Sequence, residues 1–209
     1  MRSPETAGPD RPALIGLTGA IAAGKSEALA ALARLGAATL SSDAVVHELL
    51  GEDEVRERLV ERWGRDVAPD GSVDRNRVGA LVFEQPQELG WLESILHPLV
   101  AERIALWVVG LPPHTSVAVV ELPLLFETGM EDEFDATISV VADDAARAAR
   151  AGARGTELLE GRSGRQLSQA EKAARATFVV RNDGSLADLE AGLAEAWPRL
   201  EVAAKARVR

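Results

Sequence analysis

The 209-residue sequence contains no cysteine, and this absence removes several kinds of chemistry at once. It excludes disulfide bonds, thiolate metal sites and cysteine nucleophiles. The longest apolar run, residues 104–109, is far shorter than the ~20 residues that a membrane-spanning helix needs. Residues 1–12 contain prolines and acidic residues but lack the apolar stretch of a signal peptide, so we expect a disordered tail there. These absences favour a cytoplasmic protein with no membrane partner.

Positive charge is also scarce. The formal net charge of −10 at pH 7 argues against nucleic acid as the main partner. Lysine occurs at only three positions, and the densest group of cations lies between Arg147 and Arg181. One interpretation of this group is a solvated helical face. The other is a local cationic patch that binds a polyanion.

The sequence does contain the pattern G-x-x-x-x-G-K-S, placed between the apolar run 14–18 and a helical pattern. Its residues are Gly19, Ala20, Ile21, Ala22, Ala23, Gly24, Lys25 and Ser26. In such a loop, backbone N–H groups at a helix N-terminus surround a nucleotide phosphate. We expect Lys25 to reach the β- and γ-phosphates and Ser26 to ligate Mg²⁺. The alternative is a glycine-containing turn from strand to helix that binds nothing.

Apolar periodicity along the chain alternates between strands and helices. Strands are expected at 14–18, 37–40, 117–122, 136–141 and 178–180. Helices are expected at 26–36, 44–50, 54–63, 74–83 and 86–109, the last interrupted at Pro98. This order predicts an α/β fold with a doubly wound, parallel, five-stranded sheet. The long stretch without a strand, about 45–110, predicts a helical insertion that binds a substrate.

Several side chains are candidates for chemistry beyond this loop. Asp43 is either the base that accepts a proton from an attacking hydroxyl or a plain helix cap. Glu121 or Glu127 could act through water on Mg²⁺, although Glu127 could also be a surface residue that opens a turn. His97 is either a ligand contact or a packed helical histidine. Arginines and glycines mixed over 147–165 indicate either a mobile lid that closes on phosphates or a flexible surface loop.

Together these residues resemble the dephospho-CoA kinase family over about 14–190. The family's T-G-G-I-G-S-G-K-S corresponds to 18–26, and its D-A-D-x-I-x-x-E-L corresponds to 41–49. Its H-P matches His97-Pro98, and its P-L-L-F-E matches 123–127. Its R-x-x-x-Q, E-K and N-x-G match 162–166, 171–172 and 182–184. The loop is shared with many kinases, whereas the later motifs in this order are specific to the family.

The resemblance implies a P-loop kinase, similar in fold to nucleoside-monophosphate kinases, that uses ATP to phosphorylate the ribose 3′-hydroxyl of dephospho-CoA. It implies a catalytic set of Asp43, Lys25, Arg147 and Arg162. It implies an ATP-binding set of residues 19–27, including Glu27, together with Asn182, and a substrate-binding set of His97, Leu124 and Glu127. Mg²⁺ on Ser26 completes the site.

The chain departs from the family pattern at a few positions. Ala20, Ala22 and Ala23 stand where glycine, glycine and serine are usual, and Ser41 replaces the first aspartate of D-A-D. Thr177 stands where the family prefers aspartate. If position 22 requires a positive φ, alanine there is unfavourable by ~1–2 kcal/mol.

We therefore expect a single kinase domain over 13–200 between tails at 1–12 and 201–209. Its core would comprise 13–44 and 115–200, with the acceptor insertion at about 45–110 and the lid at about 147–166. The expected partners are ATP and dephospho-CoA, and the protein would be a monomer or a weak homo-oligomer. Another small-acceptor kinase is the alternative enzyme. A degenerate nucleotide-binding regulator is the alternative without catalysis.

Overall fold

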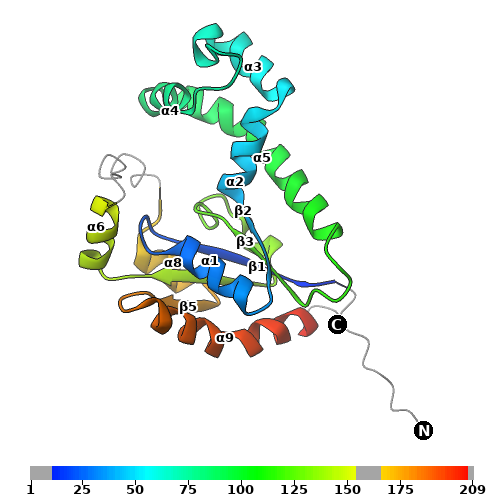
Figure 1. The fold of residues 1–209 in the computed structure, drawn as a ribbon, viewed down its shortest axis with the longest axis vertical. Coiled ribbons are helices and arrows are strands. Elements are labelled where there is room, and N and C mark those ends of the chain that lie inside the picture. Colours follow the sequence, from blue (N-terminus) through cyan, green and yellow to red (C-terminus); the bar gives the residue numbers. More distant parts are fainter. Residues whose placement is uncertain (1–10, 154–165, 207–209) are drawn as a thin grey trace. The chain divides into compact units, whose positions relative to one another are not determined.

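The computed structural model describes residues 11–153 and 166–206, which form two compact units. One unit consists of the described residues up to Ser41 and those from Gly110 onward, and the other is Ser42–Val109 (Figure 1). In these described ranges, no helix is long and apolar enough to cross a membrane.

A five-stranded, fully parallel sheet forms the centre of the first unit. Its strands are β1 (Ala13–Gly19), β2 (Ala38–Ser41), β3 (Val117–Glu121), β4 (Ala136–Val141) and β5 (Phe178–Arg181). Their order across the sheet is β2-β3-β1-β4-β5. All five expected strands are confirmed to within two residues at each end. Because β1 is central, the loop that follows it opens between the ends of β3 and β4.

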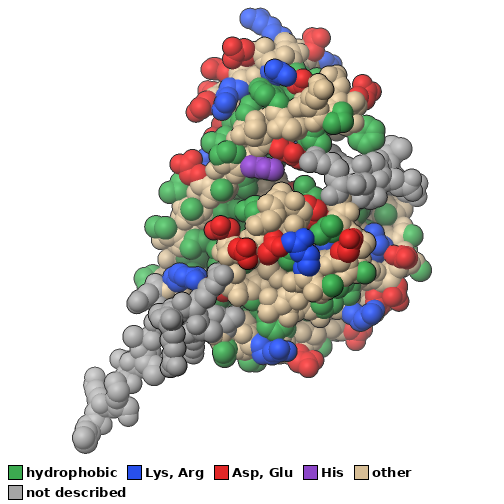
Figure 2. Space-filling model, turned by 180° about the vertical axis from the view of Figure 1, so that it is seen from behind, with side chains coloured by type: hydrophobic (Ala, Val, Ile, Leu, Met, Phe, Trp, Pro, Cys, Tyr) green, Lys and Arg blue, Asp and Glu red, His purple; other side chains and the backbone are tan. Residues whose placement is uncertain are grey.

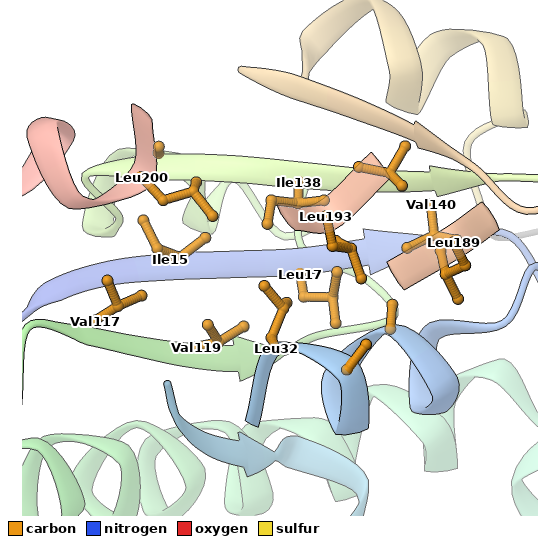
Figure 3. Packing of buried hydrophobic residues seen from close by; sticks show 14 of the residues in the cluster. Ile15, Leu17, Leu32, Val117, Val119, Ile138, Val140, Leu189, Leu193 and Leu200 are labelled. Atoms are coloured by element: carbon orange, nitrogen blue, oxygen red, sulfur yellow. The ribbon is translucent and has the colours of Figure 1, made fainter. Parts of the chain in front are cut away.

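Helices cover both faces of this sheet, as expected for a doubly wound fold. They are α1 (Lys25–Arg34) and α9 (Leu186–Ala206) on one face and α8 (Gln169–Arg175) on the other. The helix α6 (Asp144–Ala153) follows β4, and a short 3₁₀ turn lies at Met130–Glu133. Alternate residues of β1 point to opposite faces. Ile15 and Leu17 belong to the fully buried cluster that packs against α1 and α9 (Figure 3). Thr18 instead lies within hydrogen-bonding distance of α8.

A side chain of α8 binds the end of β4. Gln169 Oε1 accepts a hydrogen bond from the backbone N–H of Ala142 at 2.8 Å, and Gln169 Nε2 donates to the Ala142 carbonyl at 2.9 Å. A capping box formed by Ser168 and Glu171 begins α8 beside this contact. The end of β4 and the start of α8 are therefore held together through one side-chain amide.

The second unit is entirely helical. It contains α2 (Ser42–Gly51), α3 (Asp53–Trp63), a 3₁₀ turn (Arg65–Val67), α4 (Arg75–Glu84) and α5 (Pro86–Val109). The expected turn at Pro69–Gly71 is present, with Gly71 at φ +77°. Glu88 accepts hydrogen bonds from Arg62 at 2.9 and 3.0 Å and from Trp63 Nε1 at 2.7 Å. These donors, Arg62 foremost, lower the pKa of Glu88.

Two local expectations in this unit are wrong. The helix α5 runs through Pro98 without interruption. Buried residues on both sides of the proline, Leu96 and Val100 among them, continue the packed face across the lost hydrogen bond. In addition, α2 begins at Ser42, so Asp43 lies inside its first turn and is not the residue that caps it.

Candidate functional site

The phosphate loop, residues 19–26, connects β1 to α1, as the sequence pattern predicts. A Cβ atom at Gly19 would lie 2.5 Å from the backbone oxygen of Val140, so β4 leaves no room for a side chain. Gly24 has φ +99°, and a Cβ atom there would lie 2.0 Å from Nδ2 of Asn182. Contact with the backbone of β4 therefore requires the first glycine of the motif, and the positive φ favours glycine at the second.

Ala22 has φ +59° and is the one non-glycine residue with a positive φ in the part of the chain that the structure describes. The sequence left open whether position 22 requires a positive φ, and the structure shows that it adopts one. Alanine adopts it at a cost of ~1–2 kcal/mol because its Cβ crowds the following carbonyl. The chain thus holds strain at the centre of the phosphate loop, a pattern that is frequent at ligand-binding sites.

Lys25 lies back across the loop that precedes it. Its Nζ donates to the carbonyl oxygens of Gly19 and Ala20, each at 3.2 Å. Ser26, the next residue of α1, is exposed. The ammonium and the hydroxyl expected to meet phosphate and Mg²⁺ thus belong to the first turn of one helix.

Two side chains from distant segments bind two further carbonyls of the loop. Arg147 Nε, in α6, donates to the carbonyl of Ile21 at 3.0 Å. Asn182 Nδ2, directly after β5, donates to the carbonyl of Ala23 at 2.9 Å. Arg150 Nη2 in turn donates to Asn182, at 2.8 Å to the backbone oxygen and 3.3 Å to Oδ1. These arginines therefore face the loop and are not simply part of a solvated helical face.

Acidic partners surround this end of β5. Asp183 accepts hydrogen bonds from the backbone N–H of Asp143 at 2.6 Å and from Arg181 at 2.9 Å. These two donors, Arg181 first, lower the pKa of Asp183. Acidic and basic side chains are interspersed on the face drawn in Figure 2. The cations of this region are thus already partly neutralised by the protein.

A buried ion pair lies on the other side of β1. Lys172, in α8, is fully buried, and its Nζ lies 2.8 Å from Oε1 of Glu127 and 2.6 Å from the carbonyl of Pro123. It also donates to Thr18 Oγ1 at 3.4 Å, and Glu127 accepts from the N–H of Leu167 at 2.8 Å. Glu127 is thus not a surface residue, and Lys172 is not on a solvated face. Sequence reasoning missed this pair, although the motifs P-L-L-F-E and E-K contain its two residues.

For the other expected site residues, the structure gives the exposure and the unit to which each belongs. Asp43 and His97 are both exposed and belong to the second unit, so the packed alternative for His97 is wrong. Leu124 is half-buried in the turn after β3, and Glu121, at the end of β3, is buried. Arg162 and most of the expected lid lie outside the described residues. Within those residues, no group of three or more histidine, cysteine or acidic side chains could hold a metal ion.

Comparison with known proteins assigns the family. The pattern of the family described as "Dephospho-CoA kinase" matches residues 13–188. The chain belongs to this family. A dephospho-CoA kinase of Deinococcus radiodurans is 38% identical over 205 residues, covering 96% of this chain and 99% of the relative. One of Symbiobacterium thermophilum is 40% identical over 190 residues, covering 88% and 80%.

A solved structure shares the fold of this chain. The crystal structure of TT1252 from Thermus thermophilus superposes with a TM-score of 0.78 and 34% identity, covering 91% of this chain and 98% of that one. The family motifs P-L-L-F-E and N-x-G follow β3 and β5 here, and the phosphate loop follows β1. These segments meet at the carboxyl edge of the sheet, where parallel α/β folds bind their ligands.

Proposed function

We propose that the protein transfers the γ-phosphoryl group of ATP to the ribose 3′-hydroxyl of dephospho-CoA, giving coenzyme A and ADP. The observation that carries this proposal is the phosphate loop. It has the required glycines, the left-handed turn and the lysine, in a chain that matches the dephospho-CoA kinase family from residue 13 to 188.

The chemistry follows from the residue types. The phosphate loop and Lys25 bind the β- and γ-phosphates and balance charge on the transferred group. Asp43 orients the acceptor hydroxyl and takes its proton. The freed oxygen attacks the γ-phosphorus, and the bond to the ADP oxygen breaks. Arg147 and Arg162 add positive charge around the phosphates, while His97, Leu124 and Glu127 belong to the acceptor side.

Mg²⁺ fits the residues present. This ion keeps most of its waters and needs only one or two protein ligands beside the nucleotide phosphates. The exposed hydroxyl of Ser26 supplies such a ligand, and the described residues offer no dense acidic cage. Bound there, Mg²⁺ would neutralise charge on the phosphate oxygens.

We also propose the bounds of the kinase domain, of the acceptor insertion and of the lid from the match to the family. The kinase domain spans about 13–200, the acceptor binds to the insertion at about 45–110, and the lid spans about 147–166. We propose a cytoplasmic monomer or weak homo-oligomer that does not bind nucleic acid.

Product formation tests this function. The protein is expected to release ADP in proportion to coenzyme A when ATP, Mg²⁺ and dephospho-CoA are present. A panel of nucleoside monophosphates and other small hydroxyl acceptors should give far less product. If dephospho-CoA gave no turnover while another acceptor did, the acceptor assignment would be wrong. ATP binding without any turnover would indicate a regulator.

Asp43→Asn tests the base. Loss of a general base lowers kcat by ~10²–10⁴-fold, whereas ATP affinity should stay within about twofold because the carboxylate acts on the acceptor. Glu48→Gln is the matched control, since Glu48 is another exposed carboxylate of α2. Unchanged kcat in Asp43→Asn would refute the assignment.

A further inference from the structure

We propose that Arg147 and Asn182 are positioning residues that aim the N–H groups of the phosphate loop at the nucleotide phosphates. The inference rests on the proposed function, because it concerns how the same loop binds ATP. The family resemblance implies only that Asn182 belongs to the ATP-binding set, and the alternative to a positioning role is direct contact with the adenine base.

Each carbonyl of the loop that is bound by Arg147 or Asn182 shares a peptide group with an N–H of the loop. A trans peptide is planar, so its C=O and its N–H point in opposite directions. The carbonyl of Ile21 is bound by Arg147, and the N–H of the same peptide belongs to Ala22. The carbonyl of Ala23 is bound by Asn182, and the N–H of that peptide belongs to Gly24. Holding each carbonyl outward directs the matching N–H into the loop, where an anion binds.

The orientation of the Asn182 amide is fixed by its other partner. Arg150, a donor only, lies at 3.3 Å from Oδ1 and at 2.8 Å from the backbone oxygen of Asn182. With Oδ1 facing the guanidinium, Nδ2 faces the carbonyl of Ala23. The flipped amide would place donor against donor and oxygen against oxygen. Arg150 therefore acts on the loop through Asn182.

The burial of Asn182 favours a positioning role over contact with the adenine base. Asn182 is only 6% exposed, and its backbone N–H donates to the Val141 carbonyl at 2.8 Å. Its Nδ2 would lie 2.0 Å from a Cβ atom at Gly24, so the amide packs directly against the loop. Both polar atoms of the side chain are used within the protein. A role at the phosphate end follows.

This chain has a particular need for such support. Ala22 stands in the left-handed conformation, which glycine adopts freely and alanine does not. The hydrogen bond from Arg147 meets the peptide directly before Ala22. It is charge-assisted and therefore stronger than a neutral one. Arg147 thus opposes relaxation of the loop at its most strained residue.

Equilibrium binding without acceptor tests the proposal, using ATP, GTP and inorganic tripolyphosphate as probes in the presence of Mg²⁺. Asn182→Ala is expected to weaken the binding of ATP and of tripolyphosphate by the same factor, about tenfold. This is the value of one hydrogen bond to a charged group, here the bond from the Gly24 N–H to a phosphate. The ratio of ATP to GTP affinity should not change. Arg147→Lys keeps the charge but loses the Nε donor, and it should show the same pattern more weakly. Arg181→Gln, at an exposed arginine near Asn182, is the control and should leave all three affinities unchanged.

The alternatives give other patterns. Weaker ATP binding with unchanged tripolyphosphate binding, or a lost preference for ATP over GTP, would assign Asn182 to the base and overturn the proposal. Unchanged affinity for all probes would also overturn it. Thermal unfolding of each variant identifies one that fails to fold, and Arg147→Lys then decides the outcome. Failure of the proposed function would instead appear in the wild-type protein, as ATP binding without formation of coenzyme A.

Discussion

Replacing Ala22 by glycine should stabilise the protein, although glycine usually weakens a fold. The reason is the φ of +59° at this residue. Alanine is unfavourable in the left-handed region by ~1–2 kcal/mol relative to glycine. Against this gain, glycine gives the unfolded chain more freedom, which costs ~0.5–1 kcal/mol. The methyl group of Ala22 is only half-buried, so its removal adds little.

The net expectation is stabilisation by ~0.5–1 kcal/mol. For a protein of this length, ~1 kcal/mol shifts Tm by ~2–4 °C, so Ala22→Gly should melt ~1–4 °C higher. Ala23→Gly provides the matched control one residue away. Ala23 is fully buried, and its φ is not positive. Losing its methyl costs ~0.8 kcal/mol, and the added chain freedom costs ~0.5–1 kcal/mol, so this variant should melt several degrees lower.

The assay is thermal and urea unfolding of the three proteins without ligand. Opposite signs for the two substitutions are expected, and neither should change the urea m-value. If Ala22→Gly were no more stable than wild type while Ala23→Gly behaved as expected, the strain at Ala22 would be refuted. In that case the left-handed turn would not limit stability, and Arg147 would have no strain at Ala22 to oppose.

Two further predictions concern buried and titrating charges. Lys172→Met should destabilise the protein by ~3–5 kcal/mol in urea unfolding, because Glu127 would remain buried without its partner. Adding Glu127→Gln to this variant should recover part of the lost stability. If the double variant recovered none of it, the two residues would not act as a pair. Hydrogen bonds from the Ser185 side chain and then its backbone lower the pKa of Asp188 from its ordinary 3.8. The stabilisation is therefore present above that value and is lost as pH falls through the lowered pKa. Asp188→Asn should be less stable than wild type near neutral pH, and the two Tm values should converge in acid; a constant difference would refute the linkage.

Much of the fold could be predicted because its signals are local. Buried parallel strands read as continuous apolar runs such as Val117–Val120, and the loop between β1 and α1 has a fixed spacing. Whether position 22 has a positive φ was left open by the loop sequence and was decided by the structure. Helix ends and the continuity of α5 across Pro98 were less accessible, since packing from both sides decided the latter.

The contacts that organise the site could not be read from spacing. Lys172 meets Pro123 and Thr18, which are 49 and 154 residues away in sequence. A lysine in a short helix reads as exposed until its partners are known. Asn182 meets Ala23 across 159 residues, so its hydrogen bond to the loop depends on the order of the strands. The sequence motifs contain Lys172 and Asn182, and only the fold showed what these residues contact.

The Gln169 amide has a consequence for how this protein can change over evolutionary time. Gln169 and Ala142 are 27 residues apart in sequence, yet two hydrogen bonds join them at the edge of the sheet. Between them lies α6, whose Arg147 and Arg150 bind Ile21 and Asn182. Because Gln169 joins the start of α8 to the end of β4, a substitution in α6 can change its contacts with the phosphate loop while this connection is kept.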